Sequence, residues 1–347
     1  MDARPRTHEN GSGAIQVVAD GPDPAGVATS EAPARHSPRS GRLWRQAPSW
    51  ALGVALLAFI AARADLGRLL PALAQVPWWR WALAALGLSA SYLFRAGRIH
   101  AELGRRWGAS RRRCLEVMLL HNAAVNVVPM RGGDLAYPYL VHQRLGVPIA
   151  DGVGSLVWMR CQDALVLALL ATAIWPGIPP AIRWAGAASI AAAMAGLVRI
   201  LPWTAVRLAG VAERRRLLGI LRAALVAVAQ ATEHGPAGWA CCAASWSTKL
   251  VAVGSLLAPL AGLSALGAVS GALGGEIAGA LPLQGPAGFG TYEVAVWAGA
   301  SLGGPATLQV ALAAAAVHVF ALAVALCGGL VGLAPRLLQR DCERAAR

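Results

Sequence analysis

Apolar runs, several of them long enough to cross a bilayer, recur along the whole chain. A spanning helix needs about 20 mostly apolar residues, and the runs lie at about 48–64, 81–94, 149–175, 181–201, 237–263 and 307–333. The chain is 56% hydrophobic and 14% charged, whereas soluble domains carry about 25% charged residues. Because the runs are continuous and do not alternate with polar residues, the sequence predicts a membrane protein built from helices.

The apolar sequence that begins at Cys114 is interrupted by residues that a lipid-facing helix excludes. The segment Asn126–Asp134 reads Asn-Val-Val-Pro-Met-Arg-Gly-Gly-Asp. Broken backbone at membrane depth is tolerated only where it is buried in protein or lines a wet cavity. Charges such as Arg131 and Asp134 cost roughly 2.5–3.5 kcal/mol each at the bilayer centre, so their presence indicates a function.

The alternative for this stretch is a charged surface loop. The run at about 149–175 also carries Arg160 and Asp163, three residues apart and so on one helix face, which favours buried charge. The second half repeats the pattern, with glycine- and proline-broken sequence and carboxylates in Gly271–Glu276 and Leu281–Glu293. Two interrupted segments in corresponding positions of two halves indicate a midplane binding site in a transporter.

Positive charge gathers in short segments beside the apolar runs. The net charge of +14 would suggest nucleic acid in a soluble protein, but this distribution is the positive-inside pattern, so we expect no nucleic-acid partner. Arginines at 35–45 place the N-terminus in the cytoplasm, and the basic segments near 95–113 and 207–222 favour the same side. The central stretch at 114–146 must then enter and leave on one face, as a re-entrant or broken hairpin.

These features predict an all-α polytopic membrane helix bundle of about 6–8 spanning or re-entrant segments. We expect two pseudo-related halves with broken helices at the centre. Residues 1–43 are expected to be a disordered cytoplasmic tail, residues 44–335 the membrane domain, and residues 336–347 a short basic cytoplasmic tail. The six cysteines form no C-x-x-C pair and the seven histidines no H-x-x-x-H pair, so we expect no metal or other cofactor.

Four short motifs follow one another across the membrane region. They are Arg95 and Arg98; Asn126, Pro129, Arg131 and Gly133; Arg160 with Asp163; and Leu281-Pro282 followed by Gly288-Phe-Gly-Thr-Tyr-Glu293. Over about residues 46–335 the chain thereby resembles the lysylphosphatidylglycerol synthetase/flippase transmembrane family. The resemblance implies a plasma-membrane protein that binds an anionic or polyprenyl-linked lipid and moves it between leaflets.

Some members of that family also carry a soluble domain that transfers an aminoacyl group. This chain ends about a dozen residues after its last apolar run, so we expect no lipid aminoacylation and no enzyme. A membrane-embedded enzyme or accessory subunit in lipid-linked sugar or lipid modification remains the alternative function. A homo-oligomer is compatible with the sequence.

Two residues depart from the family pattern Arg-x-Gly-Glu-x-x-Arg. Asp134 stands in place of the glutamate and keeps the charge on a shorter side chain. Tyr137 stands in place of the second arginine, which removes a donor that could bind phosphate in bidentate fashion. We therefore expect an altered headgroup preference or an altered activity.

Nine side chains are candidates for binding the lipid headgroup: Arg95, Arg98, Asn122, Asn126, Arg131, Asp134, Arg160, Asp163 and Glu293. Each has a structural alternative. The arginines and aspartates could pair with one another, and the asparagines could cap freed backbone groups. Glu293 could neutralise a buried arginine of the first half or carry protons. Lys249 is expected to pair with Glu276 or to extend toward the interface.

Overall fold

The computed structural model describes residue 58 and residues 66–128, 132–207, 225–226, 228–229, 235–281 and 285–345. All of these belong to one compact unit formed by residues 42–347. The described residues are helical and contain no strand, which confirms the all-α prediction. The predicted tail at 1–43, Arg131, and most of the first apolar run and of the basic segment at 207–222 lie outside the described residues.

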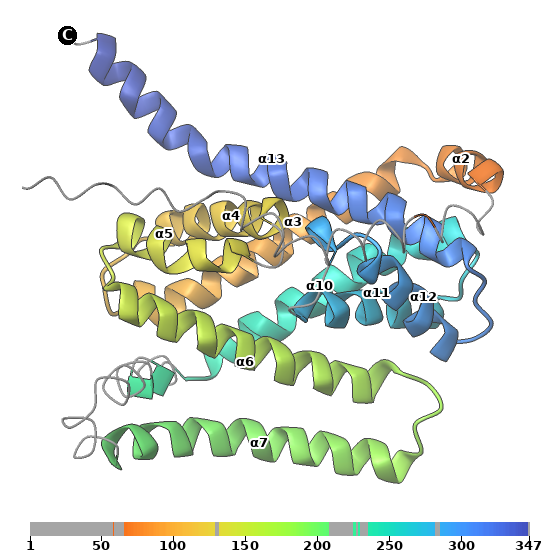
Figure 1. Ribbon diagram of the computed structural model, residues 1–347, viewed down its shortest axis with the longest axis horizontal. Helices are drawn as coiled ribbons and strands as arrows, with labels where there is room; N and C mark the ends of the chain where they lie inside the picture. The colour runs from red at the N-terminus through yellow and green to blue at the C-terminus, as the bar shows by residue number, and fades with distance from the viewer. Residues whose placement is uncertain are drawn as a thin grey trace, which may run out of the picture. The chain divides into compact units, whose positions relative to one another are not determined.

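The long helices follow the apolar runs closely (Figure 1). In chain order the described helices are α2 (Leu66–Gln75), α3 (Trp78–Ile99), α4 (Arg111–Val127), α5 (Ala136–Leu145), α6 (Ile149–Ile174), α7 (Pro180–Arg207), α10 (Pro236–Ala261), α11 (Ala265–Ala280), α12 (Thr291–Leu302) and α13 (Gln309–Ala345). Within this part of the chain, four segments are long and apolar enough to cross a membrane: α6, residues 180–200 of α7, α10 and residues 309–334 of α13. The chain is therefore a polytopic helix bundle.

The helices form two series with the same order. In the first, α3 is followed by the pair α4 and α5 and then by α6; in the second, α10 is followed by α11 and α12 and then by α13. The series pack crosswise, with α3 against α10, α4 against α13 and α6 against α11 (Figure 1). This arrangement agrees with the predicted organisation in two related halves.

In each half, an interruption of the helical backbone separates the two short helices. In the first half, α4 is followed by Val128 in extended conformation, and a 3-10 helix, Gly132–Leu135, leads into α5. In the second half, α11 is followed by Leu281, which is also extended, and α12 begins after Gly290. Gly290 has a φ of 84°, a conformation that glycine adopts without the steric cost of a side chain. Both breaks lie in the glycine- and proline-containing segments that the sequence indicated.

Glycines bring α11 and α12 into close contact. A Cβ at Gly274 would lie 2.4 Å from the carbonyl oxygen of Ala295, and a Cβ at Gly299 would lie 2.5 Å from that of Ser270. Between membrane helices there is little hydrophobic driving force, so small residues that allow close backbone approach stabilise the contact. The second hairpin therefore depends on the absence of side chains at these positions.

The variant Gly274→Ala is expected to destabilise the protein by about 1–3 kcal/mol, the usual effect of overpacking. Gly279→Ala is a matched control on the same helix, because its added methyl group meets no atom within 4 Å. Thermal unfolding in detergent, followed by tryptophan fluorescence, measures the difference. Equal midpoints for the two variants would contradict the packing described for α11 and α12.

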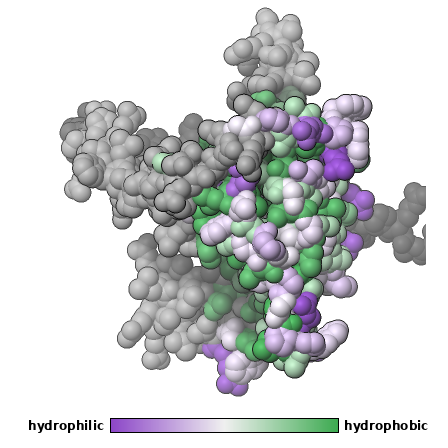
Figure 2. Space-filling view, turned by 90° about the vertical axis from the view of Figure 1, so that its right-hand side faces the viewer, coloured by the Kyte–Doolittle hydropathy of each residue, from purple (hydrophilic) through white to green (hydrophobic). Residues whose placement is uncertain are grey.

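Large apolar side chains lie on the outside of the bundle as well as in its core. Exposed examples are Leu83, Leu86, Trp184, Val251 and Leu330. Figure 2 shows one face, on which hydrophobic residues occupy much of the described surface and the most hydrophilic ones lie toward the edges. Apolar area on this scale is unfavourable in water, at about 25 cal/mol per Å², and is suited to contact with lipid.

Candidate functional site

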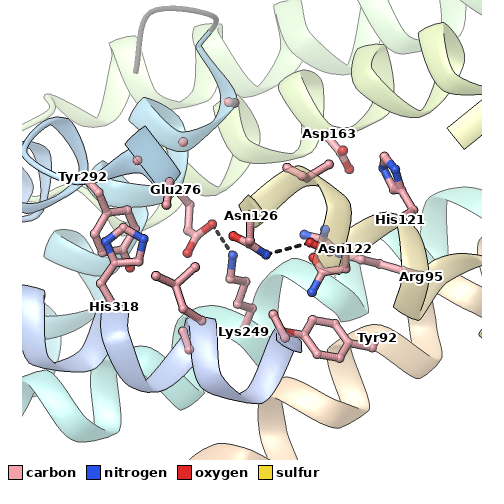
Figure 3. Close-up of a pocket in the computed structure, with 18 of the residues that line it drawn as sticks. Tyr92, Arg95, His121, Asn122, Asn126, Asp163, Lys249, Glu276, Tyr292 and His318 are labelled. Atoms are coloured by element: carbon pink, nitrogen blue, oxygen red, sulfur yellow. Dashed lines mark hydrogen bonds and ion pairs between the residues drawn. The ribbon is translucent and has the colours of Figure 1, made fainter. Parts of the chain in front are cut away.

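A polar cavity lies where the two hairpin breaks meet (Figure 3). Its walls come from α3, α4 and α6 of the first half and from α10, α11, α12 and α13 of the second. The 3-10 turn Pro286–Gly288 of the second break packs against α4. The cavity volume is about 220 Å³, and a water molecule needs about 10–15 Å³ on this measure. The cavity therefore has room for a polar group the size of a phosphate.

Two charged groups of this cavity lie near the middle of spanning helices. Asp163 is near the middle of α6 and Lys249 is near the middle of α10. Charged side chains at such depth are costly unless they are paired or hydrated. Their partners therefore decide which groups are available to a ligand.

Asp163 is the centre of a buried ion-pair network. Its Oδ1 atom lies 2.8 Å from Nη1 of Arg98 and 3.0 Å from the indole nitrogen of Trp246, which donates to it from the other half. Its Oδ2 atom lies 3.3 Å from Nη1 of Arg160, so the expected intrahelical pair is present. Arg160 also donates to Asp134 just beyond the first break. This network joins α3, α6, α10 and the first hairpin.

Arg95 lies one helical turn before Arg98 and lines the cavity. Its Nε atom donates to the hydroxyl of Ser245 at 3.1 Å, and its guanidinium lies 4.8 Å from the ring centroid of Trp246. Among the described residues its Nη2 atom is buried and has no hydrogen-bond partner. A buried donor without a partner is unfavourable by about 1–3 kcal/mol, and by more when charged. Because Arg160 is already paired with Asp134 and Asp163, Arg95 is the arginine of the wall best suited to receive an anion.

The second half contributes two further pairs. Nζ of Lys249 lies 2.5 Å from Oε2 of Glu276, which confirms the expected pairing (Figure 3). Glu293 is fully buried, accepts the backbone N–H of Gly290 and lies 2.7 Å from Nδ1 of His318. An arginine partner, one of the two alternatives for Glu293, is not found among the described residues. A histidine and a backbone amide contact its two carboxylate oxygens instead.

The two asparagines lie at the end of α4 and both line the cavity. The amide nitrogen of Asn126 donates to the carbonyl oxygen of Asn122 at 2.8 Å (Figure 3). This carbonyl lies inside the helix, four residues before Asn126, where the backbone N–H of Asn126 is its regular donor. The contact therefore caps no freed backbone group, and the side chain of Asn122 remains at the cavity wall.

The nine candidate residues separate into three groups. Arg95, Asn122, Asn126, Arg160 and Asp163 line the cavity; Arg98, Asp134 and Glu293 contact lining residues but are not part of the wall; Arg131 lies outside the described residues. The nine candidates do not include Tyr92, His121, Trp246, Glu276, Tyr292 and His318, which also line the cavity. The histidines could have been found as polar residues within apolar runs, a signal that does not depend on their spacing.

Tyr137, one of the two departures from the family pattern, is fully buried behind the cavity. Its hydroxyl lies 3.1 Å from that of Ser155, which in turn donates to Oε2 of Glu102 at 3.1 Å. Its ring packs edge-on against His121, which does line the cavity. The substitution of arginine by tyrosine therefore changes the support of the cavity wall and not the wall itself.

Comparison with protein families gives a match. The family described as the lysylphosphatidylglycerol synthase TM region matches residues 48–329, a range that includes every residue lining the cavity. Comparisons with curated proteins and with solved structures give no match. The chain therefore belongs to the lysylphosphatidylglycerol synthase transmembrane-region family.

Proposed function

We propose that this protein binds the phosphate of an anionic or polyprenyl-linked lipid in the cavity and moves the lipid between leaflets without changing it covalently. The observation that carries the proposal is that Arg95 lines the cavity and that its buried Nη2 atom has no hydrogen-bond partner among the described residues. Guanidinium groups suit this role because their paired donors match the oxygens of a phosphate.

The charge of the cavity wall supports an anionic ligand. Arg95, Arg160 and Lys249 face two carboxylates, Asp163 and Glu276. The wall thus carries one more cationic side chain than carboxylates, without counting histidines. A phosphodiester headgroup carries one negative charge and would neutralise this excess.

The position of the cavity supports movement across the membrane. It lies between two halves of like organisation, where both contribute a broken hairpin. In transporters built from repeats, substrates bind near the bilayer midplane at the interface of the repeats, and one repeat moves against the other. We propose the same for this chain, with the plasma membrane as its location and the N-terminus in the cytoplasm.

Replacing Arg95 with glutamine is expected to slow lipid exchange about 10- to 100-fold, because a charge-assisted hydrogen bond contributes about 1.5–3 kcal/mol. The measurement uses proteoliposomes with fluorescent phosphatidylglycerol or fluorescent polyprenyl phosphate and an external quencher. Arg80→Gln is the matched control, since Arg80 lies on the same helix but outside the cavity. Exchange should stay at the wild-type rate in the control.

Two results would contradict the proposal. One is an Arg95→Gln variant that folds normally and exchanges both lipids at the wild-type rate. The other is a new covalent product when the purified protein is incubated with labelled lipid donors, which would favour the enzymatic alternative. Thermal unfolding of Arg95→Gln separates loss of exchange from loss of folding.

A further inference from the structure

A second, basic pocket of about 460 Å³ lies between α3, α4 and α10. Its basic side consists of His100, Arg105, Arg111 and Arg112, and apolar residues such as Leu93 and Leu115 form the other side. None of its lining residues is shared with the cavity described above. The two sites are therefore separate.

The arginines place this pocket at the boundary of the membrane. Arg105 follows the short π-helix His100–Gly104 at the end of α3, and Arg111 begins α4. Several arginines so close together would be very unfavourable in hydrocarbon, so this connection belongs at the membrane surface. Leu93, two helical turns before His100, is 57% exposed on the outside of the bundle. The pocket thus extends from a charged rim toward an apolar surface.

The positive charge of the rim is poorly neutralised by the protein itself. No carboxylate lines the pocket, and neither Arg105 nor Arg111 forms an ion pair within the described part of the chain. Arg112 lies 3.4 Å from Glu116, but its side chain is 76% exposed. The N-terminus of the 17-residue helix α4 adds a further preference for an anion at this place.

We propose that this pocket binds the phosphate of an anionic phospholipid, with an acyl chain along Leu93 and Leu115, as a site separate from the transport cavity. A lipid headgroup and a free phosphate ion would share one interaction here, a phosphate held by two or three guanidinium groups. Basic pockets between membrane helices at the surface are suited to such headgroups. A free phosphate ion would use the rim alone, whereas a lipid would also cover the apolar side.

Cys241 provides a readout confined to this pocket. It lines the pocket and is partly exposed. The purified full chain is reconstituted in phosphatidylcholine vesicles with or without phosphatidylglycerol, alkylated with a thiol reagent, and analysed by peptide mass spectrometry. Phosphatidylglycerol is expected to slow alkylation of Cys241 about tenfold in the wild type, and inorganic phosphate is expected to leave it unchanged.

The double variant Arg105→Gln/Arg111→Gln should lose this protection. The double variant Arg106→Gln/Arg113→Gln is the matched control, because it removes the same charge from the same connection but from side chains outside the pocket. Protection in the control should equal that of the wild type, and Arg95→Gln should also retain it, whatever its effect on exchange. Equal loss in both double variants, unchanged protection in the first, or protection by inorganic phosphate would each overturn the proposal.

Discussion

Replacing Asp163 with alanine should lower the free energy of unfolding by about 3–5 kcal/mol, the usual effect of removing one partner of a buried ion pair. The reason is that Arg98 is only 4% exposed and would keep its charge in the core without a counter-ion. The indole N–H of Trp246 would lose its acceptor at the same time. Because Trp246 lies on the opposite half, the change also loosens the contact between α6 and α10.

Denaturation in mixed detergent, followed by tryptophan fluorescence, measures this loss. Asp151→Ala is a suitable control on the same helix, since Asp151 forms no ion pair among the described residues and lies in the first turn of α6. Its effect should be at most about 1 kcal/mol, the size of a charge interaction with the helix dipole. If the two alanine variants unfold at the same detergent fraction, the network around Asp163 does not stabilise the bundle.

A compensating pair tests whether charge or shape matters at this place. Replacing a whole buried ion pair with apolar residues of similar volume is often neutral or stabilising. The double variant Arg98→Met/Asp163→Leu should therefore be more stable than Asp163→Ala. The double variant should still lose lipid exchange if Asp163 in the wall is needed to position Arg160. In the wild type, Nη1 of Arg160 donates a hydrogen bond to Asp163. Recovery of stability without recovery of exchange would separate the two roles of this carboxylate.

The helices could be predicted because the signals that define them are local. The run at 149–175 becomes α6, Ile149–Ile174, and the run at 237–263 becomes α10, Pro236–Ala261. Their lengths follow from the thickness of hydrocarbon that a helix must cross. The positions of both backbone breaks could also be predicted from the sequence, since proline, glycine and charge together cannot continue a lipid-facing helix.

The partners of the charged residues could not be predicted in the same way. Arg98 and Asp163 are 65 residues apart in the chain, and Glu293 and His318 are 25 apart. Which carboxylate meets which cation depends on how α3, α6, α12 and α13 cross, and the sequence carries no local signal for that. For Lys249 the sequence left two alternatives, and the structure shows the pair with Glu276. Arg95 and Arg98, one turn apart, looked equivalent in sequence, yet only Arg95 lines the cavity.

Two substitutions of Glu293, to alanine and to glutamine, are expected to have different effects. The difference separates the structural role of this residue from a role in exchange. Its carboxylate accepts the N–H of Gly290, where φ is 84°, and meets Nδ1 of His318 in α13. Glu293→Ala would leave both groups buried without this partner. We expect it to lower the free energy of unfolding by about 3 kcal/mol, because each unsatisfied buried group costs about 1–3 kcal/mol.

Glu293→Gln keeps the size of the side chain and an oxygen that can accept from Gly290, so its stability should stay within about 1 kcal/mol of the wild type. An amide, however, can neither carry the negative charge nor take up a proton beside His318, which lines the cavity. If transport needs that charge or proton, Glu293→Gln should slow lipid exchange about tenfold or more, equivalent to about 1.4 kcal/mol. The same proteoliposomes used for Arg95→Gln provide the measurement. Wild-type exchange in Glu293→Gln together with a destabilised Glu293→Ala would assign this residue to holding the second hairpin alone.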